Sequence, residues 1–494
     1  MKIRAAAMVA ACASLTSLGA LASCAESVPD GKPAAWVADT SQFHPGPSPR
    51  ETLADRYRDA AAKIIAAARA DRGAYAKLQT LTDRVGHRLS GSPELDHAIE
   101  WAQHAMADDG HDVQLEKVMV PHWVRGAEDA QITAPVQRDL HVIGLGGTVG
   151  TPKGGVSGPI VVVHDWTELE AKRDAVKGAI VVYDVAMPPW TEAEGSHYGE
   201  VVQYRWNGAS RAAKLGAVAV LMRSVTAHSL RTPHAGSMSY DDAAPKIPAL
   251  AVTVEDAELL ARLAEQGQVT VHLHADDQQL ADAPSANVIG EFKGKDKPDE
   301  VVVLGAHLDS WDVGQGAHDD GAGCVTMMQA LTTLRKLGLQ PRRTIRVVLF
   351  TNEENGVRGG KTYAADHAAE LGNTVFAFES DSGGFAPRTF GLKAKDAAVT
   401  ARAHDRVADI AKLVAPIGVT KVSDDSAGAD VSPMIDGGVV AGELGTLGRT
   451  YFDIHHTDAD TLDKVDPQEL ADDVAAVAVL AYVVADMPDR LDAP

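Results

Sequence analysis

The chain has 494 residues, of which 45% are hydrophobic and 23% are charged, the balance of an ordinary globular protein. This length exceeds what one ordinary hydrophobic core serves, so two or three domains are expected. The formal net charge of -22 argues against a nucleic-acid partner, because nucleic-acid binding needs a basic surface. The same charge says little about a small substrate.

The first 23 residues have the features of an export signal. Two cations near the start precede an Ala-rich apolar run that extends to Ala22. The run ends in Leu-Ala-Ser-Cys, which resembles a bacterial lipobox, so we expect a lipid on Cys24 that anchors the exported protein to the bacterial membrane, facing the periplasm or the exterior. An ordinary signal cleaved near Ala22 is the alternative. Residues 24–50 are polar and Pro-rich and would form a tether.

The three cysteines predict neither an internal disulfide nor a metal-binding thiol. Of the three cysteines, Cys12 and Cys24 belong to the signal segment, so the mature chain would keep one ordinary thiol and no internal disulfide. That thiol, Cys324, lies on the apolar stripe of a predicted helix, and we expect it in the core rather than at a metal. No other apolar run is long enough to cross a bilayer.

Two patterns divide the rest of the chain. Residues 51–135 and 285–494 combine helical patterns with short apolar runs and are expected to form one α/β domain. Between them, residues 136–284 consist of short β-rich runs separated by Gly, which predicts a separate, largely β domain inserted into the first, as a lid or wall over the active site. Residues 144–150 do not form a dinucleotide loop, because Val149 replaces the third glycine and no Rossmann unit follows.

The α/β domain is expected to contain a mostly parallel sheet. Helical patterns cover residues 53–83 and 95–106, and a strand follows at 113–120. Further strands are predicted at 301–306, 344–351, 375–379 and 439–443. Helices are predicted after Gly323 and Gly359 and at 398–414 and 467–487. Strands that alternate with helices in this way predict a parallel sheet with helices on both faces.

Acidic residues and histidines follow the ends of these four strands. In open parallel sheets, ligands bind at the carboxyl ends of the strands, so the side chains are expected to meet there. The residues concerned are His307 and Asp309 after the first strand, Asn352, Glu353 and Glu354 after the second, Asp381 after the third, and His455, His456 and Asp460 after the fourth.

These clusters predict a catalytic metal site. They offer imidazole and carboxylate groups without thiolate, a set that suits zinc, manganese or cobalt. The candidate ligands are His307, Asp319, Glu354, Asp381 and His456. Five ligands are more than one open tetrahedral zinc needs, but they fit two metal ions that share a bridging carboxylate, for which Asp319 is the natural candidate.

The motifs HLDS, DDGAG, NEEN, ESD and HHTDAD resemble those of the co-catalytic zinc exopeptidases, a family that includes leucyl aminopeptidases and glutamate carboxypeptidases. Within it, HLDSWDVGQGAHDDG, YGEVVQYR, PKIPALAVTVEDAELL and YVVADM are similar to segments of the carboxypeptidase Q group. The resemblance covers residues 78–487. It implies a zinc exopeptidase fold, an insert that is a protease-associated domain, hydrolysis of dipeptides or other short peptides, and a homodimer.

The same resemblance divides the ligands between two zinc ions, with His307, Asp319 and Asp381 on one and Asp319, Glu354 and His456 on the other. It also makes Glu353 the general base. Adjacent side chains of an extended segment point in opposite directions, so Glu354 can face the metal while Glu353 faces the attacking water. Glu353 would take the proton of that water and pass it to the leaving amine.

Three other acidic residues are expected to support the site. Asp309 lies two residues beyond His307, on the same side of an extended segment, where its carboxylate can accept the remaining ring N–H. Asp460 is expected to do the same for His456. Asp320 is expected to cap the following helix rather than to bind metal.

The remaining histidines and one further acid have weaker patterns. Of the adjacent His455 and His456, we expect one to point inward, and the family pattern favours the one directly before Thr457. His318 is not expected to be a ligand, and the histidines between residues 197 and 274 lack ligand spacing. Asp430 would either contact substrate or support a ligand.

Two other functions stay open. An aminopeptidase on the same scaffold would use the same metals but hold the free α-amino group of its substrate. A non-catalytic binding protein would be expected to have lost a ligand or the base, whereas all of these positions are filled. A serine hydrolase has no support, because the chain lacks a GxSxG motif.

Overall fold

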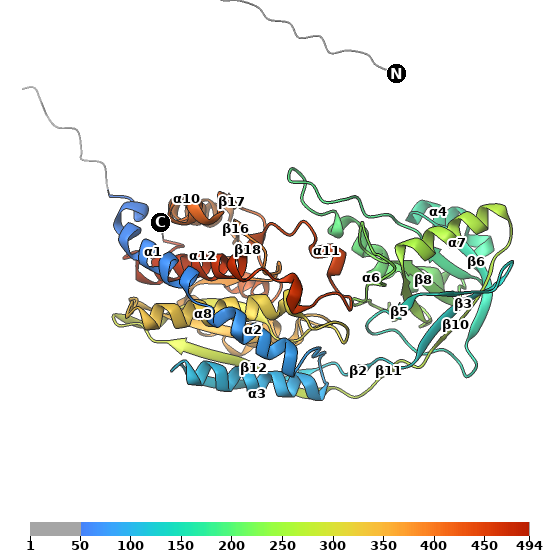
Figure 1. Cartoon of the computed structure of the whole chain (residues 1–494), viewed down its shortest axis with the longest axis horizontal. Helices are drawn as coiled ribbons and strands as arrows, with labels where there is room; N and C mark the ends of the chain where they lie inside the picture. The colour runs from blue at the N-terminus through green and yellow to red at the C-terminus, as the bar shows by residue number, and fades with distance from the viewer. Residues whose placement is uncertain (1–50, 494) are drawn as a thin grey trace, which may run out of the picture. The chain divides into compact units, whose positions relative to one another are not determined.

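The computed structural model describes residues 51–493, so the predictions for the export signal, the tether and Cys24 lie outside the described residues. A mixed eight-stranded sheet underlies the predicted site, with the strand order β1-β12-β14-β13-β15-β18-β16-β17 (Figure 1). Its strands are β1 (Asp112–Val120), β12 (Ala283–Phe292), β13 (Lys297–His307), β14 (Arg343–Phe350), β15 (Thr374–Glu379), β16 (Pro387–Lys393), β17 (Lys421–Ser423) and β18 (Ala441–Thr446).

The four strands predicted to carry the site lie side by side at the centre of this sheet. β13 pairs in parallel with β14 and with β15, and β15 pairs in parallel with β18. Toward the edges, β12 is antiparallel to β14 and to β1, and β16 is antiparallel to β18. The predicted α/β sheet is therefore confirmed, with a parallel centre and antiparallel pairs on either side of it, beyond which the edge strand β17 is parallel to β16.

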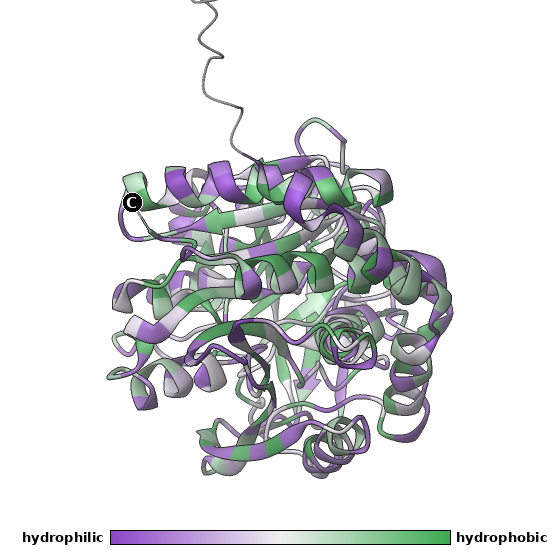
Figure 2. Ribbon diagram, turned by 90° about the vertical axis from the view of Figure 1, so that its left-hand side faces the viewer, coloured by the Kyte–Doolittle hydropathy of each residue, from purple (hydrophilic) through white to green (hydrophobic). Residues whose placement is uncertain are grey.

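Both faces of the sheet are covered, which explains the continuous apolar run in β13. Val302, Leu304 and Ala306 pack into one hydrophobic core, and Val301 and Val303 pack into a second core on the other face. Outer helices in Figure 2 are striped purple and green, as expected when only one side of a helix meets the core.

The helices of this part of the chain follow the predictions closely. The helical pattern at 53–83 is split in two, because Asp71 has an extended backbone and its side chain accepts the N–H of Gly73 (2.7 Å). Asp466 caps the last helix by accepting the N–H groups of Gln468 and Glu469. The helices are α1 (Leu53–Ala70), α2 (Gly73–Arg84), α3 (Pro93–Asp108), α8 (Ala322–Lys336), α9 (Arg358–Asp366), α10 (Ala397–Val414), α11 (Tyr451–Ile454) and α12 (Pro467–Asp486).

A second eight-stranded sheet lies in residues 128–275, which we call the second-sheet region. Its strand order is β4-β3-β10-β6-β7-β8-β9-β5. The elements are β3 (Glu128–Ala134), β4 (Arg138–Leu140), β5 (Val142–Gly144), β6 (Val156–Val163), α4 (Trp166–Ala171), α5 (Arg173–Val176), β7 (Ile180–Tyr183), α6 (Tyr198–Lys214), β8 (Ala219–Arg223), β9 (Ala249–Val252), α7 (Val254–Gln266) and β10 (Thr270–Ala275). A two-stranded pair, β2 (Trp123–Val124) with β11 (Gln278–Gln279), lies just outside it.

This region is less purely β than predicted. The predicted β-rich runs contain the strands β5 to β10, but β6, β7, β8 and β9 are parallel neighbours. Parallel neighbours need long crossover connections. The helices α4 and α5 lie between β6 and β7, α6 lies between β7 and β8, and a segment without a helix connects β8 to β9.

The loop that follows β13 joins the two sheets. Trp311, from this loop, is buried in the hydrophobic core of the second-sheet region. A Cβ on Gly146 would lie 1.9 Å from the Trp311 ring, so only glycine leaves room for the indole. Next to it, Asp312 accepts two hydrogen bonds of 2.8 Å from Arg125. This loop, which leads from His307 to Asp319, is thus held by the buried indole of Trp311 and by the hydrogen bonds of Asp312.

Two other predictions concern the helices. Cys324 is fully buried in the main core, as predicted. Within residues 51–493, no helix combines the length and the apolar character needed to cross a membrane.

Asp473 generates a prediction about stability. It is 1% exposed on α12, and its Oδ1 has no hydrogen-bond partner among the described residues. Burial, then repulsion from Glu469 and Asp472, raises its pKa well above the ordinary value. A carboxyl group whose pKa is higher in the folded than in the unfolded state loses stability as pH rises above the unfolded pKa.

Asp473→Asn should therefore raise the free energy of unfolding by about 1–3 kcal/mol at pH 8 and have little effect at pH 4. Denaturant titration at both pH values measures this, with Asp59→Asn, at an exposed position on α1, as the control. A gain of the same size at both pH values would show that the buried charge is not the cause.

Candidate metal centre

The carboxyl edge of the central strands brings all five predicted ligands together. His307 ends β13, Glu354 follows β14 and Asp381 follows β15. Asp319 lies in the short helix η2 (Ala317–Gly321), and His456 lies just after α11. Four of these side chains are almost fully buried, and that of Asp381 is 26% exposed. The site is therefore largely shielded, with one side open.

Asp319 lies between two pairs of residues. Its Oδ1 is 3.3 Å from His307 Nε2, which is also 3.4 Å from Asp381 Oδ1. Its Oδ2 is 3.2 Å from His456 Nε2, which is also 3.2 Å from Glu354 Oε2. Each oxygen of Asp319 thus faces a different imidazole, and each imidazole also lies next to a second carboxylate, the arrangement that a bridging carboxylate requires.

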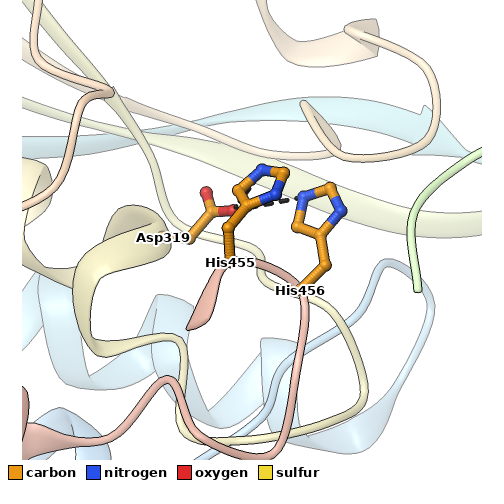
Figure 3. A group of neighbouring side chains, drawn as sticks. All are labelled: Asp319, His455 and His456. Carbon is orange, nitrogen blue, oxygen red and sulfur yellow. Dashed lines mark ion pairs between the residues drawn. The ribbon is translucent and has the colours of Figure 1, made fainter. Parts of the chain in front are cut away.

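His455 also faces Asp319, so the expectation that only one of the two adjacent histidines points inward is wrong. His455 Nε2 lies 3.4 Å from Asp319 Oδ2, and the two imidazole rings are stacked with centroids 3.5 Å apart (Figure 3). The reason is local: His456 has a left-handed backbone (φ 61°), whereas the expectation assumed an extended segment, in which neighbouring side chains diverge.

The donor set fits zinc. The buried atoms His307 Nε2, Asp319 Oδ2 and Glu354 Oε1 have no hydrogen-bond partner among residues 51–493. Buried polar atoms are almost always paired, because leaving them unpaired is unfavourable. Imidazole nitrogens and carboxylate oxygens are ordinary zinc ligands. Two overlapping groups place such atoms within 4.8 Å of one another: His307, Asp319 and Asp381, and Asp319, His455 and His456. Glu354 is in neither group, but its Oε2 lies 3.2 Å from His456 Nε2.

The charges of these residues are mutually dependent. Burial lowers the pKa of His307, but Asp381 and Asp319 outweigh it and raise that pKa well above its usual value. Burial likewise opposes ionisation of Asp319, yet His307 and His456 hold its pKa well below the usual range. Against burial, Glu354 and Asp319 raise the pKa of His456 to about 8. Asp319 therefore carries negative charge, whereas burial raises the pKa of Glu354 to about 7 and that of Asp381 above its usual value. A bound divalent cation would favour the ionised form of all three carboxyl groups.

Glu353 lies beside the ligands, in the loop after β14. Burial is the main reason that its pKa is raised well above the usual value, and the charges of Asp381, Asp430 and Glu354 add to the effect. A carboxyl group with a raised pKa is better matched to accepting and returning a proton near neutral pH.

Asp309 differs from the prediction in how it holds its neighbours. His307 Nδ1 lies 3.0 Å from the backbone carbonyl oxygen of Asp309, whereas a carboxylate oxygen is 3.8 Å away. The carboxylate instead accepts the backbone N–H groups of Glu353 (3.0 Å) and Glu354 (3.3 Å). Asp309 therefore orients His307 through its main chain and fixes the loop of Glu353 and Glu354 through its side chain.

Asp460 also holds a backbone segment, in place of the predicted contact with the ring of His456. Its carboxylate accepts the N–H groups of His318 (2.8 Å) and Asp319 (3.1 Å). It therefore supports Asp319 rather than His456.

Asp320 and His318 flank Asp319 and contact different parts of the backbone. Asp320 accepts the N–H of Gly323 in the first turn of α8 (3.0 Å), as a capping residue does. His318 accepts the N–H of Gly384 through Nδ1 (3.1 Å), and its ring stacks on Phe385. It is not part of either group of potential metal ligands among the described residues.

Glu379, the last residue of β15, was not singled out in the sequence. It is fully buried and accepts the N–H of Val431 (2.9 Å), while the buried Asp430 accepts the N–H of Gly360 (3.2 Å). Burial raises the pKa of Asp430 to about 8. Asp430 thus supports the backbone near the site. The sequence signal that could have revealed Glu379 is its position two residues before Asp381, because residues two apart at a strand end lie on the same side.

A cavity of about 380 Å³ opens beside the ligands. Asp319, Glu353, Glu354, Asp381 and His456 lie on its wall. The opposite elements are α6 and α11, which contribute the residues Tyr198, Arg205, Trp206, Tyr451 and Phe452. The residues of α6 were missed by sequence analysis, because they belong to the second-sheet region and carry no ligand pattern.

Known proteins resemble this chain in sequence and in fold. The model of "Peptidase family M28" matches residues 287–481. Carboxypeptidase Q from Mus musculus is 39% identical over 447 residues, which are 90% of this chain and 92% of the relative. A solved peptidase M28 precursor from Shewanella amazonensis SB2B is 37% identical, with a TM-score of 0.84 over 88% of this chain and 98% of that chain.

A zinc aminopeptidase from Bacillus subtilis has the same fold, with a TM-score of 0.61 at 19% identity over 85% of this chain and 96% of that chain. The identity and coverage of the carboxypeptidase Q relatives decide the assignment. The chain belongs to peptidase family M28, as the resemblance of its motifs to the zinc exopeptidases predicted, and is a metallopeptidase.

Proposed function

We propose that the chain is a dinuclear zinc exopeptidase that hydrolyses dipeptides or other short peptides, as a carboxypeptidase or dipeptidase similar to carboxypeptidase Q. The observation that carries this proposal is the position of Asp319, whose two oxygens face different imidazole and carboxylate pairs. A single metal ion would leave one of these pairs without a role. The names of the curated relatives support the choice of reaction.

The proposed division of ligands follows the two sides of Asp319. His307 and Asp381 would join Asp319 at one zinc ion, and Glu354 and His456 would join it at the other. His456 is favoured over His455 because its Nε2 also faces Glu354 (3.2 Å). When bound, the zinc ions would supply Lewis-acid activation of the attacking water and of the scissile carbonyl.

Glu353 is the proposed general base. It lines the cavity next to the ligands, where it can take a proton from the attacking water and return it to the leaving amine. Its main chain is held by the carboxylate of Asp309, which also fixes Glu354. The positions of the base and of one ligand are therefore coupled.

The second-sheet region is proposed to be a protease-associated insert that forms one wall of the cavity. The proposed catalytic domain would then comprise residues 51–135 and 285–494, interrupted by an insert at 136–284, although β3 already joins the second sheet from Glu128. We further propose export by the signal at residues 1–23, lipid anchoring through Cys24 and a homodimer. These proposals rest on the sequence pattern and the family resemblance.

An aminopeptidase is the second candidate function. It is suggested by the solved aminopeptidases with this fold, which at under 25% identity show the fold alone. Assays on dipeptides with one blocked terminus distinguish an aminopeptidase from a carboxypeptidase. Hydrolysis that requires a free amino group but tolerates a blocked carboxyl group would favour the aminopeptidase.

Glu353→Gln tests the base. The amide keeps the size of the side chain but cannot take a proton, so kcat should fall by about 10²- to 10⁴-fold while zinc content stays unchanged. Dipeptide hydrolysis and metal analysis of the same sample measure both quantities. Glu370→Gln, at an exposed position after α9, is the control. Turnover near the wild-type rate would contradict the assignment.

Asp319→Ala tests the bridge. Both zinc ions would lose a ligand, so the variant should retain far less zinc than the wild type, whereas Asp381→Ala should chiefly affect one of the two ions. Zinc per chain after dialysis is the measurement. Chelation of the wild type should abolish hydrolysis, and added zinc should restore it. A full complement of zinc in Asp319→Ala would refute the shared carboxylate.

A further inference from the structure

The chain passes between the two sheets twice, and the two connecting segments lie side by side. Residues 121–127 lead from β1 to β3, residues 276–282 lead from β10 to β12, and β2 pairs with β11 between the sheets (Figure 1). We call these two segments the junction. They are the covalent links between the second-sheet region and the rest of the molecule, so their contacts affect how firmly the two sheets are held together.

Two buried acids lie at one end of the junction. Glu128 is the first residue of β3, and Asp277 follows β10, which pairs with β3. The side chain of Glu128 is 7% exposed, and Asp277 is 5% exposed. A Cβ on Gly144 would overlap Glu128 Oε1 and would lie 2.9 Å from Asp277 Oδ2, so these two oxygens face the same small space. Two ionised carboxylates in this position would repel each other.

Hydrogen bonds account for three of the four carboxyl oxygens. Glu128 Oε1 accepts from Arg125 Nη1 (3.0 Å), and Glu128 Oε2 accepts the N–H of Gly144 (2.8 Å). Asp277 Oδ1 accepts the N–H of Gly126 (2.9 Å), whereas Asp277 Oδ2 has no partner within residues 51–493. A proton on Glu128 supplies that partner, because a protonated oxygen can donate to Asp277 Oδ2 while it accepts from Arg125.

The charges around the two acids favour one shared proton. Arg125 is their cationic neighbour, but it also donates to both carboxylate oxygens of Asp312, from Nε and Nη2 (both 2.8 Å). With all three acids ionised, one cation would face three anions. Tyr240 also lies near Asp277, but burial raises the pKa of its hydroxyl, which therefore stays neutral.

Burial is the main reason that the pKa of Glu128 is raised to about 7, and the neighbouring Asp277 adds to the effect against the charge of Arg125. Burial also raises the pKa of Asp277. An open junction would expose both groups to water, where they lose their protons at lower pH, so rising pH favours the open form. The ratio of closed to open junction should fall about tenfold per pH unit from about pH 5 and level off above about pH 7.

We propose that Glu128 and Asp277 share one proton and form a pH-sensitive switch, which holds the junction closed in acid and loosens it in weakly alkaline solution. Repulsion between the ionised carboxylates would displace the backbone next to Arg125. Because Arg125 also binds Asp312, the displacement would reach the loop that leads to Asp319. The switch does not depend on which reaction the metal centre catalyses.

Asp277→Asn removes the need for the proton. The amide oxygen can accept the N–H of Gly126, and the amide nitrogen can donate to Glu128 Oε1. Hydrogen–deuterium exchange of the zinc-loaded proteins, followed by mass spectrometry, compares the segments 121–127 and 308–317 in the wild type and the variant. Intrinsic exchange rates cancel at each pH. The ratio of the wild-type rate to the variant rate should rise at least about tenfold from pH 5 to pH 8 in both segments.

Asp276→Asn is the matched control. It removes the same charge from the adjacent residue, whose side chain is 59% exposed and lies 3.2 Å from His274 Nε2. The ratio of the wild-type rate to the rate of this variant should not change with pH. Far-UV circular dichroism and zinc content show whether each variant is folded.

The wild type alone provides a second test, should Asp277→Asn not fold. Its exchange rates in the two segments, divided by the intrinsic rates, should rise about tenfold per pH unit between pH 5 and 6 and level off above about pH 7. A pH-independent value would contradict the switch.

Three results of the comparison would overturn the proposal. A constant ratio for residues 121–127 would show that the two acids do not share a proton. The same pH dependence in Asp276→Asn would show a general effect of a lost negative charge. A change at residues 121–127 without one at 308–317 would show that the switch does not reach the loop beside the metal centre. These measurements use no substrate, so a failure of the proposed peptidase reaction would leave them unaffected.

Discussion

The two carboxylate oxygens of Asp319 face imidazole groups on opposite sides, His307 on one and His455 and His456 on the other, and much of the surrounding structure keeps the carboxylate there. Asp460 holds the main chain of Asp319, and the buried Arg88 donates to the carbonyls of Leu308 (2.5 Å), Gln315 (2.9 Å) and Gly316 (2.9 Å). The chain between β13 and η2 is therefore fixed at several points. A bridging ligand needs such support, because a small displacement would break its contact with one of the two sides.

The second-sheet region contributes to the site as well as covering it. Trp311 is buried in its core, and its ring lies 5.6 Å from that of His456. Tyr198 on α6 stacks on Phe452 of α11, with ring centroids 4.6 Å apart. Figure 1 shows these two helices facing each other where the green and red segments meet. Binding sites favour such junctions, because side chains from two bodies can converge on one ligand.

The residues of the candidate metal centre could be predicted because a parallel sheet places the carboxyl ends of its strands at one edge. His307, Glu354 and Asp381 lie at or just after the ends of neighbouring strands. Their proximity can therefore be predicted without knowing the structure of the loops. The inward position of His455 could not be predicted, since it depends on a left-handed backbone at His456. The role of Asp309 was misjudged for a similar reason, because a main-chain carbonyl took the position expected for its carboxylate.

Contacts between residues that are far apart in the chain also could not be predicted from the sequence. The buried Glu379 is held by Val431, which is far away in the chain. The helices of the second-sheet region were missed because short β-rich runs do not reveal whether their strands pair in parallel. Parallel pairing is what requires the long crossover connections in which these helices lie.

A crystal structure of the zinc-loaded protein, with anomalous scattering recorded at the zinc edge, tests the central claim most directly. We expect two peaks about 3.5–4 Å apart, each close to a different oxygen of Asp319. One should also contact His307 and Asp381, and the other Glu354 and His456. A single peak, or two peaks of which only one contacts Asp319, would contradict the account.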